Sequence, residues 1–291
     1  MNRFGIRLAA ATLAALMLAA GMACGSEDAA SPTPPTDDET AGLDDPGLIH
    51  VHGLDVEPAT GTIYAATHTG LFRIADGKAE RVGDRFQDTM GFTIDGNGRF
   101  LGSGHPDLRD LRSGKFKTLL GLVESTDQGR TWKSLSLAGA ADFHALQSAH
   151  GRVYGYNVAS GAFMVSKDGR QWETRSTLRM TDFAVDPADP ERLVAALGNA
   201  VVLSTDGGRT WSAPAAPPLL VVTWPASGQP VGVSPVGDVF RGGAAWEKVG
   251  ALGGEPEALY GDTPQLLAAI EGKGILKSTD AGKTWTSIVK P

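Results

Sequence analysis

The sequence predicts an all-β fold, a six-bladed β-propeller made of four-stranded antiparallel blades. Three observations lead to this prediction. Among the 291 residues, 38 are glycine and 17 are proline, and both residue types interrupt helices, which disfavours a helical bundle. Short alternating apolar segments are separated by turns, as expected for strands. Five of the six tryptophans recur with a period near 40 residues, which is typical of propeller blades, at positions 132, 172, 211, 246 and 285.

Residues 1–23 are predicted to be an export signal rather than part of the fold. Two arginines precede an uncharged run of sixteen residues that ends in small side chains. The run is short for a membrane-spanning helix, which takes about 20 apolar residues. Because Cys24 follows directly, the segment resembles a bacterial lipoprotein signal, in which the cysteine is lipidated and becomes the N-terminus. The alternative is cleavage after Ala23, which leaves a secreted protein with a free thiol.

Residues 24–46 are predicted to be a disordered, acidic and proline-rich tether. They contain seven acidic residues, four prolines and no lysine or arginine, so they cannot bury enough apolar area to fold. The formal net charge of −7 argues against nucleic acid and anionic membrane surfaces as partners. The expected location is therefore the cell envelope, with membrane contact only through the lipid on Cys24.

The remaining chain, residues 47–291, carries a repeated Ser-x-Asp-x-Gly-x-Thr-Trp pattern. Three copies keep the full spacing and one is a residue shorter; they begin at Ser125, Ser166, Ser204 and Ser278, and a degenerate fifth copy ends at Trp246. These segments resemble the Asp-box, or BNR, repeat of sialidases and other β-propellers. Aligned by this period, residues 49–291 divide into six units, of which the first, 49–84, keeps the strands without the Asp-box.

The Asp-box is predicted to be a structural turn. Its aspartate carboxylate is placed to accept backbone N–H groups across a hairpin, and its glycine supplies a positive φ. Its tryptophan returns on the next strand and is expected to pack against a neighbouring sheet. A motif that recurs once per blade cannot be a single active site, so we assign these aspartates no catalytic role.

Polar side chains are predicted to gather at one end of the central channel, which we call the mouth. In an antiparallel meander the first strand begins at the edge where the second strand ends, opposite the Asp-box turn. Five of the six histidines fall at this edge and only His150 does not. The residues expected at the mouth are His50, His52, His68, Met90, His105, His144, Tyr156, Asn157, Glu257 and Glu271.

Three interpretations of the mouth remain open. In the first it holds a transition metal, copper or zinc, with His52, His68, His105 and His144 as first ligand candidates and His50 and Met90 as second ones. In the second it binds a small molecule or glycan through hydrogen bonds from Tyr156, Asn157, Glu257 and Glu271. In the third the polar residues only line a wet funnel.

The Asp-box resemblance implies a glycosidase of the sialidase type as an alternative function. That chemistry uses an arginine clamp, a tyrosine nucleophile and acidic partners. No aligned mouth position is arginine, although the loops at this edge contain arginines. Glu257 and Glu271 are the candidates for paired catalytic carboxylates, but both come from one blade. Enzymatic activity therefore rests on resemblance alone.

A further resemblance covers most of residues 49–291. The segments His50-Val-His52-Gly, Gly104-His105-Pro106 and Asp142-Phe-His144 look like motifs of bacterial exported propellers labelled glycosyl-hydrolase-like. Photosystem II assembly-factor propellers are similar in repeat architecture and bind proteins. This resemblance implies a third class of function, a scaffold or assembly factor with a protein partner.

Overall fold

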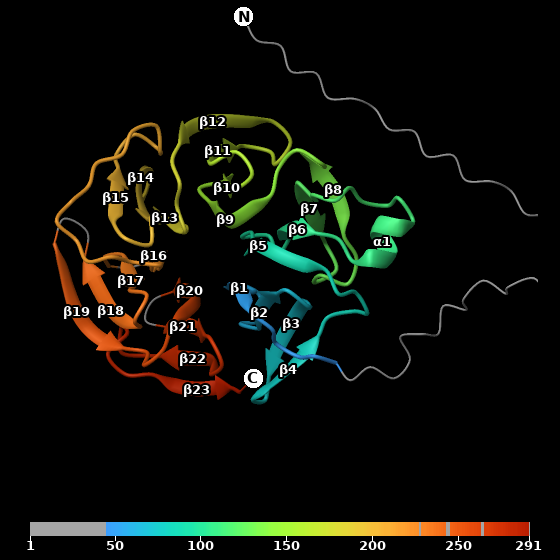
Figure 1. Cartoon of the computed structure of the whole chain (residues 1–291). Helices are drawn as coiled ribbons and strands as arrows, with labels where there is room; N and C mark the ends of the chain where they lie inside the picture. The colour runs from blue at the N-terminus through green and yellow to red at the C-terminus, as the bar shows by residue number, and fades with distance from the viewer. Residues whose placement is uncertain (1–44, 227, 243–244, 263–264, 291) are drawn as a thin grey trace, which may run out of the picture. The chain divides into compact units, whose positions relative to one another are not determined.

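The computed structural model describes residues 45–226, 228–242, 245–262 and 265–290. The predicted signal, Cys24 and most of the predicted tether lie outside these residues. The described chain forms six antiparallel sheets around a central axis, which confirms the predicted six-bladed propeller (Figure 1). Five sheets have four strands and one has three. Each sheet is built from strands that are consecutive in the sequence, so the chain completes one blade before it begins the next.

The first three blades contain twelve strands. Blade one consists of β1 (Val51–Val56), β2 (Ile63–Thr67), β3 (Gly70–Ala75) and β4 (Lys78–Arg81). Blade two consists of β5 (Asp88–Ile94), β6 (Phe100–His105), β7 (Leu122–Ser125) and β8 (Lys133–Ser136). Blade three consists of β9 (Phe143–Ala149), β10 (Arg152–Asn157), β11 (Ala162–Ser166) and β12 (Trp172–Thr177).

The last three blades contain eleven strands. Blade four consists of β13 (Asp182–Asp186), β14 (Asp189–Ala196) and β15 (Val201–Ser204). Blade five consists of β16 (Val221–Thr223), β17 (Val231–Val233), β18 (Asp238–Gly242) and β19 (Trp246–Ala251). Blade six consists of β20 (Pro256–Asp262), β21 (Gln265–Ile270), β22 (Gly274–Ser278) and β23 (Thr286–Val289).

Blade four departs from the four-stranded prediction. After β15 a single bridge between Leu203 and Ser212 stands where the other blades have a fourth strand. The residues that follow include Pro214, Pro217 and Pro218. Proline has no N–H to donate to a strand ladder, so this sequence cannot extend the pairing begun at Ser212.

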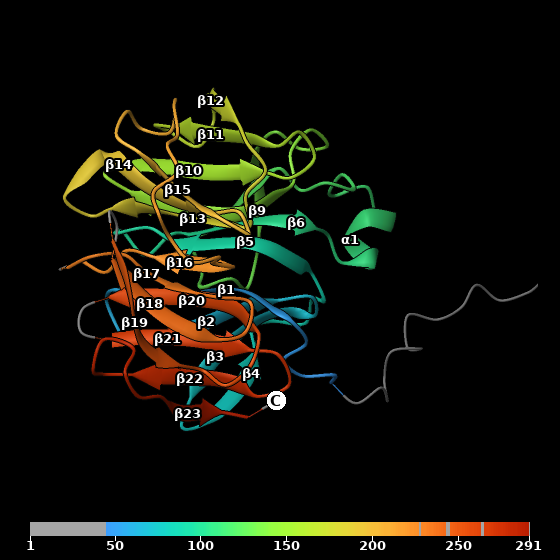
Figure 2. The same ribbon diagram turned by 60° about the vertical axis from the view of Figure 1, so that its left-hand side comes forward.

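The first strand of every blade lines the central channel (Figure 1). The channel has a volume of about 360 Å³ and is lined by residues from β1, β5, β9, β13, β16 and β20. The helix α1 (Leu108–Arg112) interrupts the connection between β6 and β7, and it projects from the face where β6 ends (Figure 2). Among the described residues, no helix has the length and apolar character to cross a membrane.

Apolar side chains between neighbouring blades form the core. Between blades one and two, the ring of Tyr64 meets the edge of Phe100 with centroids 4.7 Å apart, and both are buried with Leu71 and Trp132. Similar clusters lie between the other blades. Because these contacts are apolar and face both sheets, each blade is stabilised mainly by burial against its neighbours.

The Asp-box turns have the predicted hydrogen bonds. Asp206 accepts the backbone N–H of Thr210 at 2.9 Å and its hydroxyl at 2.6 Å, while the hydroxyl oxygen of Ser204 accepts the N–H of Gly208 at 2.8 Å. The turn at Asp280 repeats this pattern, and there the hydrogen bond from Thr284 is the largest cause that lowers the pKa of Asp280 to about 2. These bonds show a structural role for the motif.

The Asp-box also fixes each blade to the one before it. Gly208 has a φ of +87°, and a Cβ built on it would lie 2.3 Å from Cε1 of Phe163 in blade three. The indole N–H of Trp211 donates to the hydroxyl of Ser176 at 3.0 Å, and its ring meets the ring of Phe163. Glycine is therefore required both for the turn and for the close approach of the two blades.

The first described residues pack against blade one. Asp45 forms an ion pair with Arg81, at the end of β4, and accepts the N–H of Gly47 at 2.8 Å. The carbonyl of Gly47 accepts the hydroxyl of Thr69, between β2 and β3, at 2.7 Å. These contacts attach residues 45–47 to blade one.

Candidate metal centre

The structure brings the five predicted histidines together at the mouth. They come from the first three blades, because strand starts and second-strand ends share one edge of the meander. His50 precedes β1, His52 lies in β1, His68 follows β2, His105 ends β6 and His144 lies in β9. His150 follows β9 at the opposite edge, where its Nε2 donates to the carbonyl of Asp186 at 2.8 Å.

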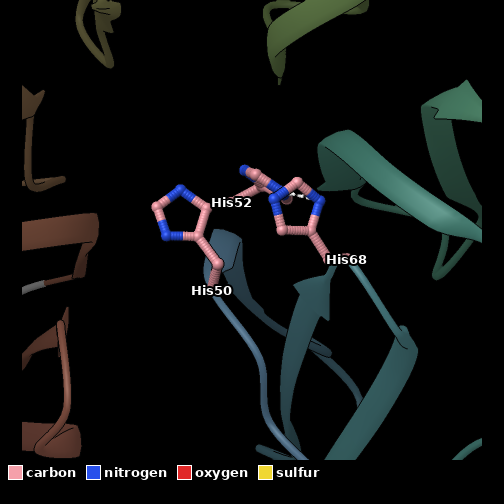
Figure 3. A group of neighbouring side chains, drawn as sticks. All are labelled: His50, His52 and His68. Carbon is pink, nitrogen blue, oxygen red and sulfur yellow. Dashed lines mark hydrogen bonds between the residues drawn. The ribbon is translucent and has the colours of Figure 1, made fainter.

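Three of these rings pack against one another (Figure 3). The ring centroid of His52 lies 4.7 Å from that of His50 and 4.3 Å from that of His68. One nitrogen from each of the three rings lies within 4.8 Å of the others, as in a set of metal ligands. The side chain of His52 is 9% exposed, whereas those of His50 and His68 are 50% and 44% exposed.

A carboxylate oxygen completes a compact group of three donor atoms. His52 Nε2 lies 3.1 Å from His68 Nδ1, His68 Nδ1 lies 2.8 Å from Asp88 Oδ1, and His52 Nε2 lies 3.7 Å from that same oxygen. Ligand atoms in a tetrahedral zinc site are about 3.3 Å apart, as follows from bonds of about 2.0–2.1 Å. Two of the three separations in this group are shorter than that value and one is longer.

Hydrogen bonds fit this triangle only if the hydrogen of His68 Nδ1 is shared. That hydrogen then points between Asp88 Oδ1 and the lone pair of His52 Nε2, in a three-centre hydrogen bond. A cation at the centre would instead be attracted by all three atoms.

His52 is neutral over the ordinary pH range. Burial, together with the nearby rings of His68, His50 and His144, lowers its pKa to about 3. Only neutral imidazole has the lone pair that binds a metal, so the fold holds His52 in the form required of a ligand.

Glu257 holds His50 in place from blade six. Its Oε1 lies 3.0 Å from His50 Nδ1, and its Oε2 accepts the backbone N–H of Val51 at 3.1 Å. The first contact places the proton on Nδ1 and leaves Nε2 of His50 with a lone pair, the arrangement found for metal-binding histidines with a carboxylate behind them. His50 also has a φ of +49°, which is uncommon for a residue with a side chain.

The other two histidines meet a second carboxylate. His144 Nε2 lies 3.1 Å from Asp142 Oδ2, and His105 Nε2 lies 4.0 Å from the same oxygen. His105 Nδ1 lies 3.4 Å from Asp88 Oδ2. Burial tends to raise the pKa of Asp142, but His144 and His105 outweigh it and the pKa is lowered. Asp142 is therefore an anion at neutral pH.

The remaining predicted mouth residues have other surroundings. Tyr156 is buried in the core between blades three and four, so the structure corrects its expected place at the mouth. Asn157 is also buried, and its Oδ1 accepts the N–H groups of Asp142 and Ala159. Met90 packs against Gly104 and is half-buried. Glu271 is exposed after β21, and Glu257 bonds as described above.

Asp88 and Asp142 were not among the sequence-predicted ligands. Asp88 begins β5 two positions before Met90, and Asp142 directly precedes β9, two positions before His144. Side chains two positions apart face the same side of a strand. Extending the predicted mouth positions by two residues toward the N-terminus is the signal that would have found both carboxylates.

Comparison with known proteins supports the fold. The BNR/Asp-box repeat family matches residues 202–213. Curated protein sequences give no match. A solved gluconolactonase, XC5397 from Xanthomonas campestris, is 13% identical, with a TM-score of 0.61 over 77% of this chain and 84% of that one.

Two further solved structures have the same architecture. YCF48 bound to D1 peptide is 16% identical, with a TM-score of 0.53 over 84% of this chain and 82% of that chain. Virginiamycin B lyase from Staphylococcus aureus is 13% identical, with a TM-score of 0.56 over 81% and 83% of the two chains. At these identities the likeness concerns the fold alone. This protein is a six-bladed β-propeller that carries BNR/Asp-box repeats.

Proposed function

We propose that this protein is an extracytoplasmic propeller that binds a transition-metal ion, Zn²⁺ or copper, at its mouth. The observation that carries the proposal is the triangle of His52 Nε2, His68 Nδ1 and Asp88 Oδ1, with separations of 2.8 to 3.7 Å. Imidazole nitrogen is a good ligand for both metals. His50, held by Glu257, is the fourth ligand of this site.

Metal titration by calorimetry tests this proposal. We expect the untagged protein to bind Zn²⁺ or Cu²⁺ at pH 7.5. His52→Ala should weaken the binding by at least about 100-fold, because losing a metal ligand lowers the affinity more than losing a residue that only hydrogen-bonds to a ligand. His150→Asn is the matched control, since His150 lies at the opposite edge and asparagine tolerates its φ of +51°. All proteins carry Cys24→Ser to remove the thiol. Absence of binding, or equal binding by His52→Ala, would contradict the proposal.

We further propose that the protein is exported and anchored by lipid at Cys24. The support is the resemblance of residues 1–24 to a lipoprotein signal and the acidic composition of the segment that follows. Mass spectrometry of the mature protein should show acyl chains on Cys24 as the first residue. An unmodified thiol at this position would contradict the anchor without affecting the metal site.

A protein partner is a second candidate function, and one observation favours it. All five large apolar side chains that stand out as exposed among the described residues lie on the face that carries the mouth: Ile49, Phe86, Leu108, Val158 and Val236, between 42% and 75% exposed. They come from blades one, two, three and five, and an interaction surface on this face would use those that adjoin one another. Cross-linking in the cell envelope should give a product that Phe86→Ser with Leu108→Ser reduces; an unchanged product would remove this candidate.

The glycosidase alternative receives no comparable support from the geometry. Both oxygens of Glu257 are engaged, by His50 and by the backbone of Val51, so its hydrogen-bonding role belongs to the candidate metal centre. We therefore leave catalysis out of the proposed function.

A further inference from the structure

The carboxylate of Asp142 has an unbalanced environment. Its side chain is 9% exposed, and Oδ1 is buried without a hydrogen-bond partner among the described residues. Its other oxygen faces the imidazoles of His144 and His105. A buried carboxylate with an unpaired oxygen is costly unless a positive charge lies beside it.

Asp88 faces two different groups of imidazoles. Its Oδ1 is the oxygen near His68 and His52, while its Oδ2 lies 3.4 Å from His105 Nδ1. A carboxylate in this position can bind one cation through each oxygen. Paired metal sites in proteins hold their two ions about 3.5–4 Å apart, a separation that one carboxylate spans.

We propose that the mouth holds a second transition-metal ion, bound by Asp142, His144 and His105 and joined to the first ion by Asp88. This inference rests on the proposed function, because it adds a neighbour to the site of His52 and His68. The donors combine imidazole nitrogen with carboxylate oxygen, a set that suits a divalent ion such as Zn²⁺. His105 and His144 are 40% and 32% exposed, so their rings have room to turn toward the ion.

The three carboxylates at the mouth carry more formal negative charge than one divalent ion neutralises. Asp88, Asp142 and Glu257 are the acidic groups in contact with the five histidines. A single divalent ion at the first site would leave the pair of Asp142 and His144 without a cation. A second divalent ion would lie beside Oδ2 of Asp142, the oxygen that faces His144 and His105.

The number of ions bound per chain distinguishes one metal site at the mouth from two. Calorimetry and elemental analysis of the Cys24→Ser protein loaded with Zn²⁺ should give two ions per chain. His144→Gln should give one, with the affinity of the tighter site changed by less than tenfold, and His150→Asn should still give two. Circular dichroism and thermal unfolding confirm that each variant is folded, and His105→Gln repeats the test at a second ligand.

Copper loading supplies an independent readout. Two Cu²⁺ ions joined by a carboxylate couple magnetically, so the second equivalent should reduce the electron paramagnetic resonance intensity per ion, and His144→Gln should abolish this loss. One Zn²⁺ per wild-type chain, or two in both wild type and His144→Gln, would overturn the second ion and leave the proposed function intact. No bound ion would overturn both.

Discussion

Asp182 gives the sharpest test of the electrostatics inside the channel. This carboxylate lies on β13 and lines the channel, where Oδ2 accepts the N–H of Val222 at 2.9 Å and Oδ1 accepts the N–H of Phe183 at 2.8 Å. Burial raises its pKa from 3.8 to about 7, and the two N–H groups only partly oppose the rise. Replacing Asp182 by asparagine removes this titration while keeping the size of the side chain.

The sign and size of the effect follow from the two pKa values. Between pH 3.8 and about 7 the folded protein binds more protons at Asp182 than the unfolded chain does. Its contribution to stability is therefore complete below pH 3.8 and is lost as pH rises through 7. Each unit of difference between the folded and unfolded pKa corresponds to about 1.4 kcal/mol of stability. The rise from 3.8 to about 7 therefore limits the loss of stability to about 4 kcal/mol, and we expect about 2–4 kcal/mol.

Urea unfolding from pH 4 to pH 8, with chelator present, measures this contribution. The free energy of unfolding of wild type relative to Asp182→Asn should fall by about 2–4 kcal/mol over this range. The comparison is necessary because His52, with its lowered pKa, changes stability in the opposite direction as the pH falls below 6.5. A difference between the two proteins that stays constant within about 1 kcal/mol would refute the reasoning.

Three other predictions concern single contacts. Gly208→Ala should lower the free energy of unfolding by about 2–4 kcal/mol, because the new Cβ would collide with Phe163. Gly98 also has a positive φ but has open space around it, so Gly98→Ala should lower the free energy of unfolding by only about 1 kcal/mol. Equal losses for the two variants in chemical denaturation would contradict this account. Trp211→Phe should cost about 1 kcal/mol through the lost indole hydrogen bond, seen as a lower denaturation midpoint; an unchanged midpoint would argue against that bond. Glu257→Gln should weaken metal binding by about 10–100-fold in calorimetry with little change in fold, and unchanged affinity would remove Glu257 from the site.

The sequence predicts the ring well because its signals are local and repeated. Each Asp-box turn forms from residues within one short segment, as the bonds of Asp206 and Thr210 show. The tryptophan at each repeat then meets the preceding blade, so one period describes both the turn and the packing. The missing fourth strand of blade four follows from local prolines that interrupt the pattern.

The site was only partly predictable because it depends on contacts between blades. The five histidines could be placed at one edge from strand direction alone. Asp88 becomes important only when blades one and two are side by side, since it reaches His68 across the interface. Tyr156 was misplaced for a related reason: alternate residues of a strand face opposite sides, and this one faces the core.

The seam of the ring, where blade one meets blade six, lies beside the candidate metal centre. Blade one and blade six are each complete in themselves, so no shared strand joins β1 to β20 in the described chain; the two ends meet through apolar packing and the bonds from Glu257 to His50 and Val51. The proposed ligands come from blades one and two, so a bound ion would hold β1 in place on one side of this joint. Amide hydrogens of β1 and β20 should then exchange faster in the metal-free protein than in the metal-loaded one, so that opening of the joint would depend on bound metal.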